Sequence, residues 1–88
     1  MEAVFFLVSG RVQGVSFRAN ARHQALALGL AGYAHNRPDG QVEVFVQGSP
    51  PALEAFARWI AQGPPLAKVE RVGRQRAQPR EMAGFGMS

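Results

Sequence analysis

The chain has 88 residues, no cysteine, and ten Lys and Arg against six Asp and Glu, which gives a formal net charge of +4. This length suffices for one hydrophobic core, so we expect a single domain over residues 1–88. The lack of cysteine excludes disulfide scaffolds, thiolate metal sites and a cysteine nucleophile. Only His23 and His35 remain as imidazole ligands, so no metal site is expected.

The positive charge is carried almost entirely by arginine, which supplies nine of the ten basic residues. Its planar guanidinium binds carboxylate and phosphate through paired hydrogen bonds, so the excess predicts an anionic partner. The first apolar run, residues 3–8, is too short for a membrane span or a signal peptide. We therefore expect a cytoplasmic protein with no membrane partner.

The first predicted element is a strand over residues 3–8, whose β-branched and aromatic run ends at Ser9-Gly10. An uninterrupted apolar run of this length indicates a strand buried on both faces, and hence a central one. The segment from Gly10 to Arg18 follows, with Gly14 four residues after the first glycine. Two glycines so close together after a strand favour a shaped loop over regular structure.

A helix is predicted from about residue 18 to residue 28, where Ala, Leu, Arg and Gln dominate. Ala21, Ala25 and Leu28 recur at helical spacing and define its apolar face. Gly29 stands where a helix commonly ends in a glycine.

Residues 30–35 and 41–47 are predicted to form a hairpin. The turn between them is Arg37-Pro38-Asp39-Gly40, in which proline presets φ and glycine accepts a positive φ. Residues 41–47 alternate strictly, so the three valines share one face of the strand. The opposite face carries Gln41, Glu43, Phe45 and Gln47.

A second helix is predicted after Ser49, which suits an N-cap, with Pro50 at the first helical position. Its apolar stripe follows helical spacing, and the helix ends at Gly63-Pro64-Pro65. The stripe consists of Leu53, Phe56, Ala57 and Ile60.

Two more strands complete the predicted order. Residues 68–76 alternate weakly and carry many charges, which is typical of an edge strand, and residues 83–87 suit a short last strand. The sequence thus predicts an α+β, ferredoxin-like βαββαβ sandwich, with a mainly antiparallel sheet and two helices on one face.

The segment from Gly10 to Arg18 is the part of the sequence best suited to chemistry. Its glycines allow successive backbone N–H groups to point at one anion, and the following helix N-terminus adds further unpaired N–H groups. Arg18 can place its guanidinium on the same anion. These features predict a phosphate site, although a plain strand-to-helix connection with a solvated arginine fits the same residues.

This segment resembles the first signature of the acylphosphatase family, written here as Val8-Ser9-Gly10-Arg11-Val12-Gln13-Gly14-Val15-Ser16-Phe17-Arg18. The second signature is matched by residues 32–42, Gly-Tyr-Ala-His-Asn-Arg-Pro-Asp-Gly-Gln-Val. The two motifs stand in the family's order and spacing, and the similarity extends through residues 69–72. The family's fold is the same βαββαβ sandwich.

The resemblance implies an enzyme that hydrolyses the carboxyl–phosphate bond of acyl phosphates by direct in-line attack of water, without metal or cofactor. It assigns Arg18 and Asn36 as catalytic, with Asn36 positioning the water. The phosphoryl group would be held by Arg18 and by the backbone of the loop residues Gln13, Gly14, Val15, Ser16 and Phe17. The implied partner is a small-molecule acyl phosphate, and we expect a monomer that binds no nucleic acid.

Two other functions remain open from the sequence. One is a non-catalytic module that binds phosphate or carbamoyl phosphate. The other is an RNA-binding module of the same topology, with Phe5 and Phe45 as the stacking aromatics. The sequence does not identify the physiological acyl phosphate.

Three side chains in or near the motifs are weaker candidates for contacts with substrate. Arg22 lies one helical turn after Arg18 and could share its face. Ser16 could donate a hydrogen bond to the phosphate. His35 replaces the longer basic or amide residue that the family usually carries beside the asparagine, and an exposed strand position is its simplest interpretation.

Overall fold

The computed structural model describes residues 1–88 and contains the strands and helices in the predicted order. The elements are β1 (Glu2–Arg11), α1 (Phe17–Ala27), β2 (Ala31–Asn36), β3 (Val42–Gly48), α2 (Pro50–Gln62), β4 (Lys68–Ala77) and β5 (Phe85–Met87). Neither helix has the length and apolar character needed to cross a membrane.

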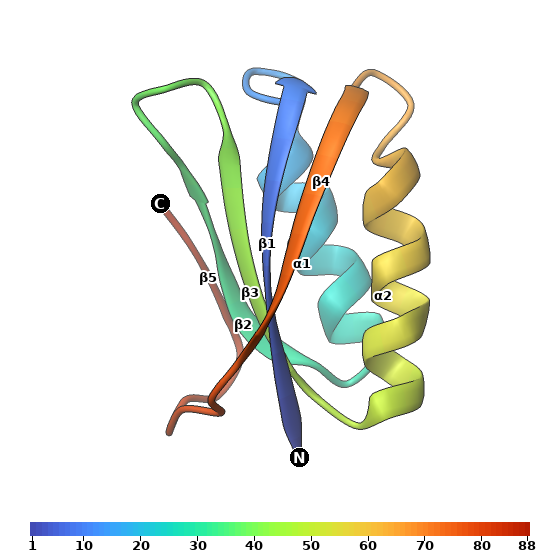
Figure 1. Cartoon of the computed structure of the whole chain (residues 1–88), viewed down its shortest axis with the longest axis vertical. Coiled ribbons are helices and arrows are strands. Elements are labelled where there is room, and N and C mark those ends of the chain that lie inside the picture. Colours follow the sequence, from blue (N-terminus) through green and yellow to red (C-terminus); the bar gives the residue numbers. More distant parts are fainter.

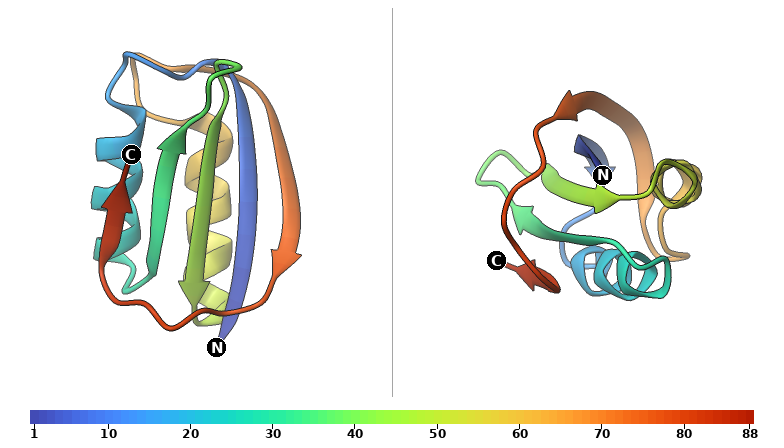
Figure 2. Two further views of the ribbon diagram at one scale, coloured as in Figure 1. Left: turned by 90° about the vertical axis from the view of Figure 1, so that its left-hand side faces the viewer. Right: turned by 90° about the horizontal axis from the view of Figure 1, so that it is seen from below.

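The strands form one sheet in the order β4-β1-β3-β2-β5. β1 pairs antiparallel with β3 and β4, β2 pairs antiparallel with β3, and β5 is parallel to β2. Both helices cover the same face of this sheet, and the opposite face is uncovered over most of its height (Figures 1 and 2). The predicted α+β, ferredoxin-like fold is confirmed.

β1 is central, as predicted, because it lies between β4 and β3. Its side chains toward the helices, Val4, Phe6 and Val8, are buried. On the other face Phe5 and Leu7 are only half-buried. The strand is therefore fully buried on one face and not on both, since no second layer covers the far side of the sheet.

The core between the sheet and the helices is built from the two predicted apolar helix faces. α1 contributes Phe17, Ala21 and Ala25, whereas the predicted Leu28 lies one residue beyond the helix and is half-buried. α2 contributes Leu53, Phe56 and Ile60. Ser49 caps α2 as predicted, because its hydroxyl accepts from the backbone N–H of Ala52 at 3.4 Å.

The Phe56 ring is the centre of this core. It is fully buried and lies 5.9 Å from the ring of Phe6 and 5.6 Å from that of Trp59, centroid to centroid. We expect Phe56→Ala to lower the free energy of unfolding by about 3–5 kcal/mol, from lost burial and the cavity left behind. Urea unfolding measures this, and the exposed Arg58→Ala should change the value by less than about 0.5 kcal/mol. A Phe56→Ala loss below about 1 kcal/mol would contradict this core.

On the face of the sheet opposite the helices, the chain covers only part of β2 and β3. The segment between β4 and β5 crosses this face at one end of the sheet (Figure 2). It places the Arg80 guanidinium 4.6 Å from the centroid of the Phe45 ring and 5.7 Å from that of Tyr33. The Gln47 amide donates to the Arg80 carbonyl at 2.8 Å and accepts from its backbone N–H at 2.7 Å. Phe45 is therefore fully buried, and a nucleic-acid base has no access to its ring.

Candidate active site

The β1–α1 loop, defined here as residues 12–16, connects the end of β1 directly to the first turn of α1. Val12 is buried in the core and anchors the start of the loop. Gly14 has a φ of 76°, a conformation that glycine adopts without strain. Ser16 has a φ of 61° and is the N-cap of α1, so the chain enters the helix through a left-handed residue.

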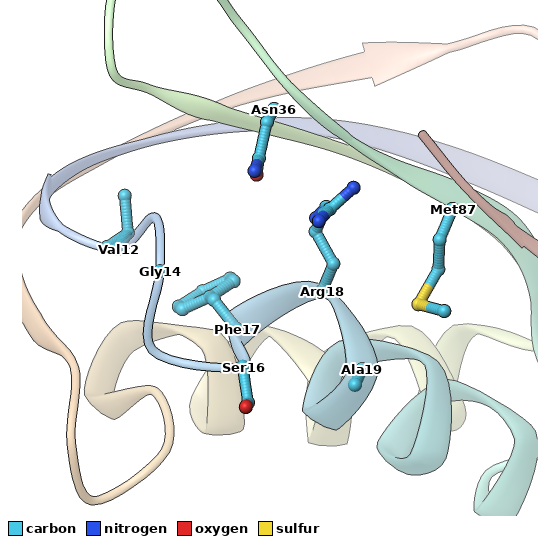
Figure 3. Close-up of a pocket in the computed structure, with 8 residues that line it drawn as sticks. All are labelled: Val12, Gly14, Ser16, Phe17, Arg18, Ala19, Asn36 and Met87. Carbon is cyan, nitrogen blue, oxygen red and sulfur yellow. The ribbon is translucent and has the colours of Figure 1, made fainter.

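The loop borders an open cavity of about 380 Å³ at the N-terminus of α1. Figure 3 shows its walls, which come from the loop, the first turn of α1, the end of β2 and the last strand. The lining residues are Val12, Gly14, Ser16, Phe17, Arg18, Ala19, Asn36 and Met87.

Arg18 projects from the first turn of α1 into this cavity (Figure 3). Its Nη1 atom donates a hydrogen bond of 2.7 Å to the main-chain oxygen of Ser88. The backbone N–H of Asn36 donates to the same oxygen at 3.0 Å. One main-chain oxygen therefore joins the guanidinium to the end of β2, which restricts the positions that the arginine can take.

Asn36 is the last residue of β2, in register with the buried Val42 of β3. Its side chain points from the sheet into the cavity, on the side opposite α1 (Figure 3). The Oδ1 atom is buried and has no hydrogen-bond partner within the protein. A buried acceptor without a partner costs free energy, so such an atom is commonly explained by a bound water or ligand.

The electrostatics of the cavity favour an anion. The N-terminus of α1 brings unpaired N–H groups and a partial positive charge, and Arg18 adds a full one. No acidic side chain lines the cavity. A compact anion bound here would meet N–H donors from one side and the Asn36 carboxamide from the other.

Comparison with known proteins agrees with this geometry. The acylphosphatase family profile matches residues 4–87. The chain belongs to the acylphosphatase family. It is therefore a hydrolase that acts on acyl phosphates, and the expectation drawn from the two sequence motifs is confirmed.

The similarity extends over nearly the whole acylphosphatase chain. An acylphosphatase of Thermus thermophilus is 51% identical over 85 residues, which cover 97% of each chain. One from Xanthomonas oryzae is 55% identical over 74 residues, 84% of each chain. The crystal structure of acylphosphatase from Bacillus subtilis has a TM-score of 0.94 and 34% identity, and the match covers 100% of this chain and 99% of that one.

The structure brings most of the acylphosphatase residues named from the sequence to one cavity. Gly14, Ser16, Phe17, Arg18 and Asn36 all line it. The Ser16 hydroxyl, however, points away from Arg18 and Asn36 (Figure 3), so only the backbone of this residue faces the site.

Gln13 and Val15 do not line the cavity. The Val15 side chain packs against the core. The Gln13 carboxamide turns toward the connection between β2 and β3, where it donates to two carbonyl oxygens. Any contact of these two residues with substrate would have to come from their backbone.

Two weaker candidates also lie outside the cavity. Arg22 donates through Nε to the carbonyl of Phe85 at 3.3 Å, so its guanidinium is bound to β5. His35 is half-buried, and its Nδ1 lies 2.8 Å from the Ser88 hydroxyl. Neither residue is among those that border the cavity.

Three cavity residues of this acylphosphatase were missed by the sequence analysis. Val12 lies inside the first motif, where its apolar character marked it only as part of the loop. Ala19 carries no functional group, and the sequence did not predict that it lines the site. Met87 reaches the site because β5 pairs with β2, a contact between distant segments that local pattern does not reveal.

Proposed function

We propose that Arg18 and the β1–α1 loop hold the phosphoryl group of an acyl phosphate while Asn36 orients the water that attacks it in line. One observation carries this proposal. The unpartnered, buried Oδ1 of Asn36 lies in the same cavity as the Arg18 guanidinium and the N-terminus of α1. The cavity thus offers a cationic side for the phosphate and a carboxamide acceptor for the nucleophile.

The leaving group explains why so few functional groups suffice. Cleavage of the P–O bond releases a carboxylate, the conjugate base of an acid whose pKa is about 4. Such a group departs without protonation, so no general acid is needed. Phosphoryl transfer passes through a loose transition state in which positioning and charge stabilisation are the main demands. The guanidinium and the backbone N–H groups meet the second demand.

Asn36 meets the demand for positioning. Its Oδ1 accepts a hydrogen bond from one O–H of the water, which leaves an oxygen lone pair free to face phosphorus. As the new P–O bond forms, the bond to the acyl oxygen breaks and its electron pair leaves with the carboxylate. The proton of the attacking water passes to the product phosphate or to solvent. The proposed step uses no metal, because the guanidinium and the loop N–H groups supply the charge stabilisation.

The partner we propose is a small-molecule acyl phosphate, and we propose a cytoplasmic monomer that binds no nucleic acid. The buried state of Phe45 supports the last point, since RNA-recognition sheets use exposed aromatics for stacking. The match to acylphosphatases over nearly the whole chain supports an enzyme over a non-catalytic phosphate-binding module.

Hydrolysis of benzoyl phosphate in H₂¹⁸O with EDTA present tests the proposal. We expect many turnovers per protein molecule, with ¹⁸O in the phosphate and none in the benzoate, because water attacks phosphorus. Mass spectrometry of both products measures this. Binding without turnover would support the non-catalytic alternative. Label in the benzoate would move the attack to carbon, and inhibition by EDTA that magnesium reverses would require a metal.

A further inference from the structure

We infer that the Gln13 side chain is a positioning residue that ties the β1–α1 loop to the turn following Asn36. Its Nε2 donates to the carbonyl oxygens of Arg37 at 2.8 Å and Gln41 at 2.9 Å. Both carbonyls belong to the connection between β2 and β3. The inference rests on the proposed function, because the tether joins the part that would hold phosphate to the part that would hold water.

The tether attaches next to the reacting groups on both sides. Gln13 immediately precedes Gly14, which lines the cavity, and Arg37 immediately follows Asn36. A shift of the loop relative to the turn therefore changes the distance between bound phosphate and the Asn36 carboxamide directly. The two segments are 24 residues apart along the chain, so the tether is a long-range contact.

The turn that receives the tether is itself well fixed. The backbone N–H of Arg37 donates to the Gln41 carbonyl at 2.8 Å, and that of Gly40 donates to the Arg37 carbonyl at 3.1 Å. Asp39 accepts from the backbone N–H of Gln41 at 3.0 Å and from the Arg37 guanidinium at 3.2 Å. The N–H of Gln41, with the Arg37 guanidinium adding to it, holds the pKa of Asp39 below its usual value. Gln13 thus binds to an ordered support.

The loop, in contrast, has few polar restraints of its own. None of the 13 backbone hydrogen bonds outside the helices and strands involves residues 12–15, and the last loop residue, Ser16, only accepts, through its carbonyl from Asn20. The two bonds from Gln13 are the only side-chain hydrogen bonds that these four residues make. This leaves the backbone N–H groups of the loop free for a ligand. It also leaves the Gln13 carboxamide, together with buried Val12, to fix where the loop lies.

Removing the tether is expected to affect turnover more than phosphate binding. In Gln13→Met and Gln13→Ala the carboxamide donor is lost, while Arg18 and the N-terminus of α1 remain. We expect kcat for benzoyl phosphate to fall about tenfold or more, since misplacement of reacting groups by about 1 Å is costly. The inhibition constant of inorganic phosphate should change less than about threefold. Gln75→Met is the matched control, because this glutamine is exposed on β4 and makes no side-chain hydrogen bond.

A double-mutant cycle separates positioning from general destabilisation. If Gln13 acts by placing the loop relative to Asn36, Gln13→Met should cost less than about twofold in an Asn36→Ala background. If the fold-loss of kcat in the double variant equals the product of the losses in the two single variants, the inference is overturned. So would a kcat within twofold of wild type in both Gln13 variants, provided that they unfold well above the assay temperature.

NMR spectra test the tether without an activity measurement, so the test does not depend on the proposed function. In ¹⁵N-correlated NMR spectra, Gln13→Met should shift the side-chain amide of Asn36 and the backbone N–H of Gly14, and Gln75→Met should not. Unchanged resonances at both sites would refute the tether whatever the kinetics show. If the resonances move but wild-type protein fails to hydrolyse benzoyl phosphate, the proposed function is wrong and the tether stands.

Discussion

Replacing Arg18 with alanine is expected to lower kcat/KM for benzoyl phosphate by at least about 10²-fold, the usual loss on removing one donor to a developing oxyanion. The guanidinium is the only full positive charge that lines the cavity. Its loss should therefore weaken binding of inorganic phosphate as well as turnover. Steady-state kinetics and competitive inhibition by phosphate measure the two effects.

Two variants make the Arg18 result specific. Arg18→Lys keeps the charge but loses the fork of paired donors, so we expect it to recover only part of the lost activity. Arg58→Ala removes an exposed arginine of α2 and should leave both constants unchanged. Near-wild-type turnover and phosphate inhibition in Arg18→Ala would refute the assigned role.

Replacing Asn36 with alanine is expected to give a different pattern. The carboxamide is assigned to the water and not to the phosphate, so kcat should fall at least about 10²-fold. Inhibition by inorganic phosphate should remain within about threefold of wild type. The far-UV circular dichroism spectrum should also be preserved, because the Oδ1 atom has no partner within the protein to lose.

The contrast between the two variants is the informative result. Loss of phosphate inhibition in Arg18→Ala with its retention in Asn36→Ala would assign the two side chains to different reactants. Equal loss of phosphate inhibition in both would make Asn36 a phosphate ligand and contradict its role toward water. Unchanged kcat in Asn36→Ala would remove it from the reaction altogether.

The sequence predicts the elements well because their signals are local. The alternation of residues 41–47 and the stripe of Leu53, Phe56 and Ile60 each lie within a single element, and both helices and all five strands occur where expected. The turn after β2 follows in the same way from its proline and glycine. The candidate site was likewise predictable, since the loop and Arg18 are contiguous and Asn36 lies in a second motif.

What the sequence could not provide are contacts between distant segments. The bond from Arg18 to the Ser88 oxygen spans 70 residues, and the cover of Phe45 by Arg80 depends on a chain crossing the uncovered face of the sheet. The alternation of β3 alone placed Phe45 on the face opposite the valines but gave no reason for it to be buried. Such features depend on how the elements pack and not on the period of any one of them.

The β1–α1 loop has features of both kinds, some predictable from local sequence and some that depend on distant contacts. The motif predicted that Gln13 belongs to the site. Its side chain, however, donates to a residue of the β2–β3 turn that lies 24 positions later in the sequence, and no local pattern predicts such a bond. The left-handed conformation of Ser16, which sends its hydroxyl away from the cavity, is equally invisible in sequence. The motif therefore identifies the loop, but not which of its side chains border the cavity.

The most direct test of the account is a crystal structure of the protein with bound orthophosphate. We predict a phosphate held by the backbone N–H groups of the β1–α1 loop and by the Arg18 guanidinium. A water molecule should lie between that phosphate and Asn36 Oδ1, within hydrogen-bond distance of the latter. Phosphate bound elsewhere, or an Asn36 carboxamide turned out of the cavity, would contradict the proposal that one cavity holds both reactants.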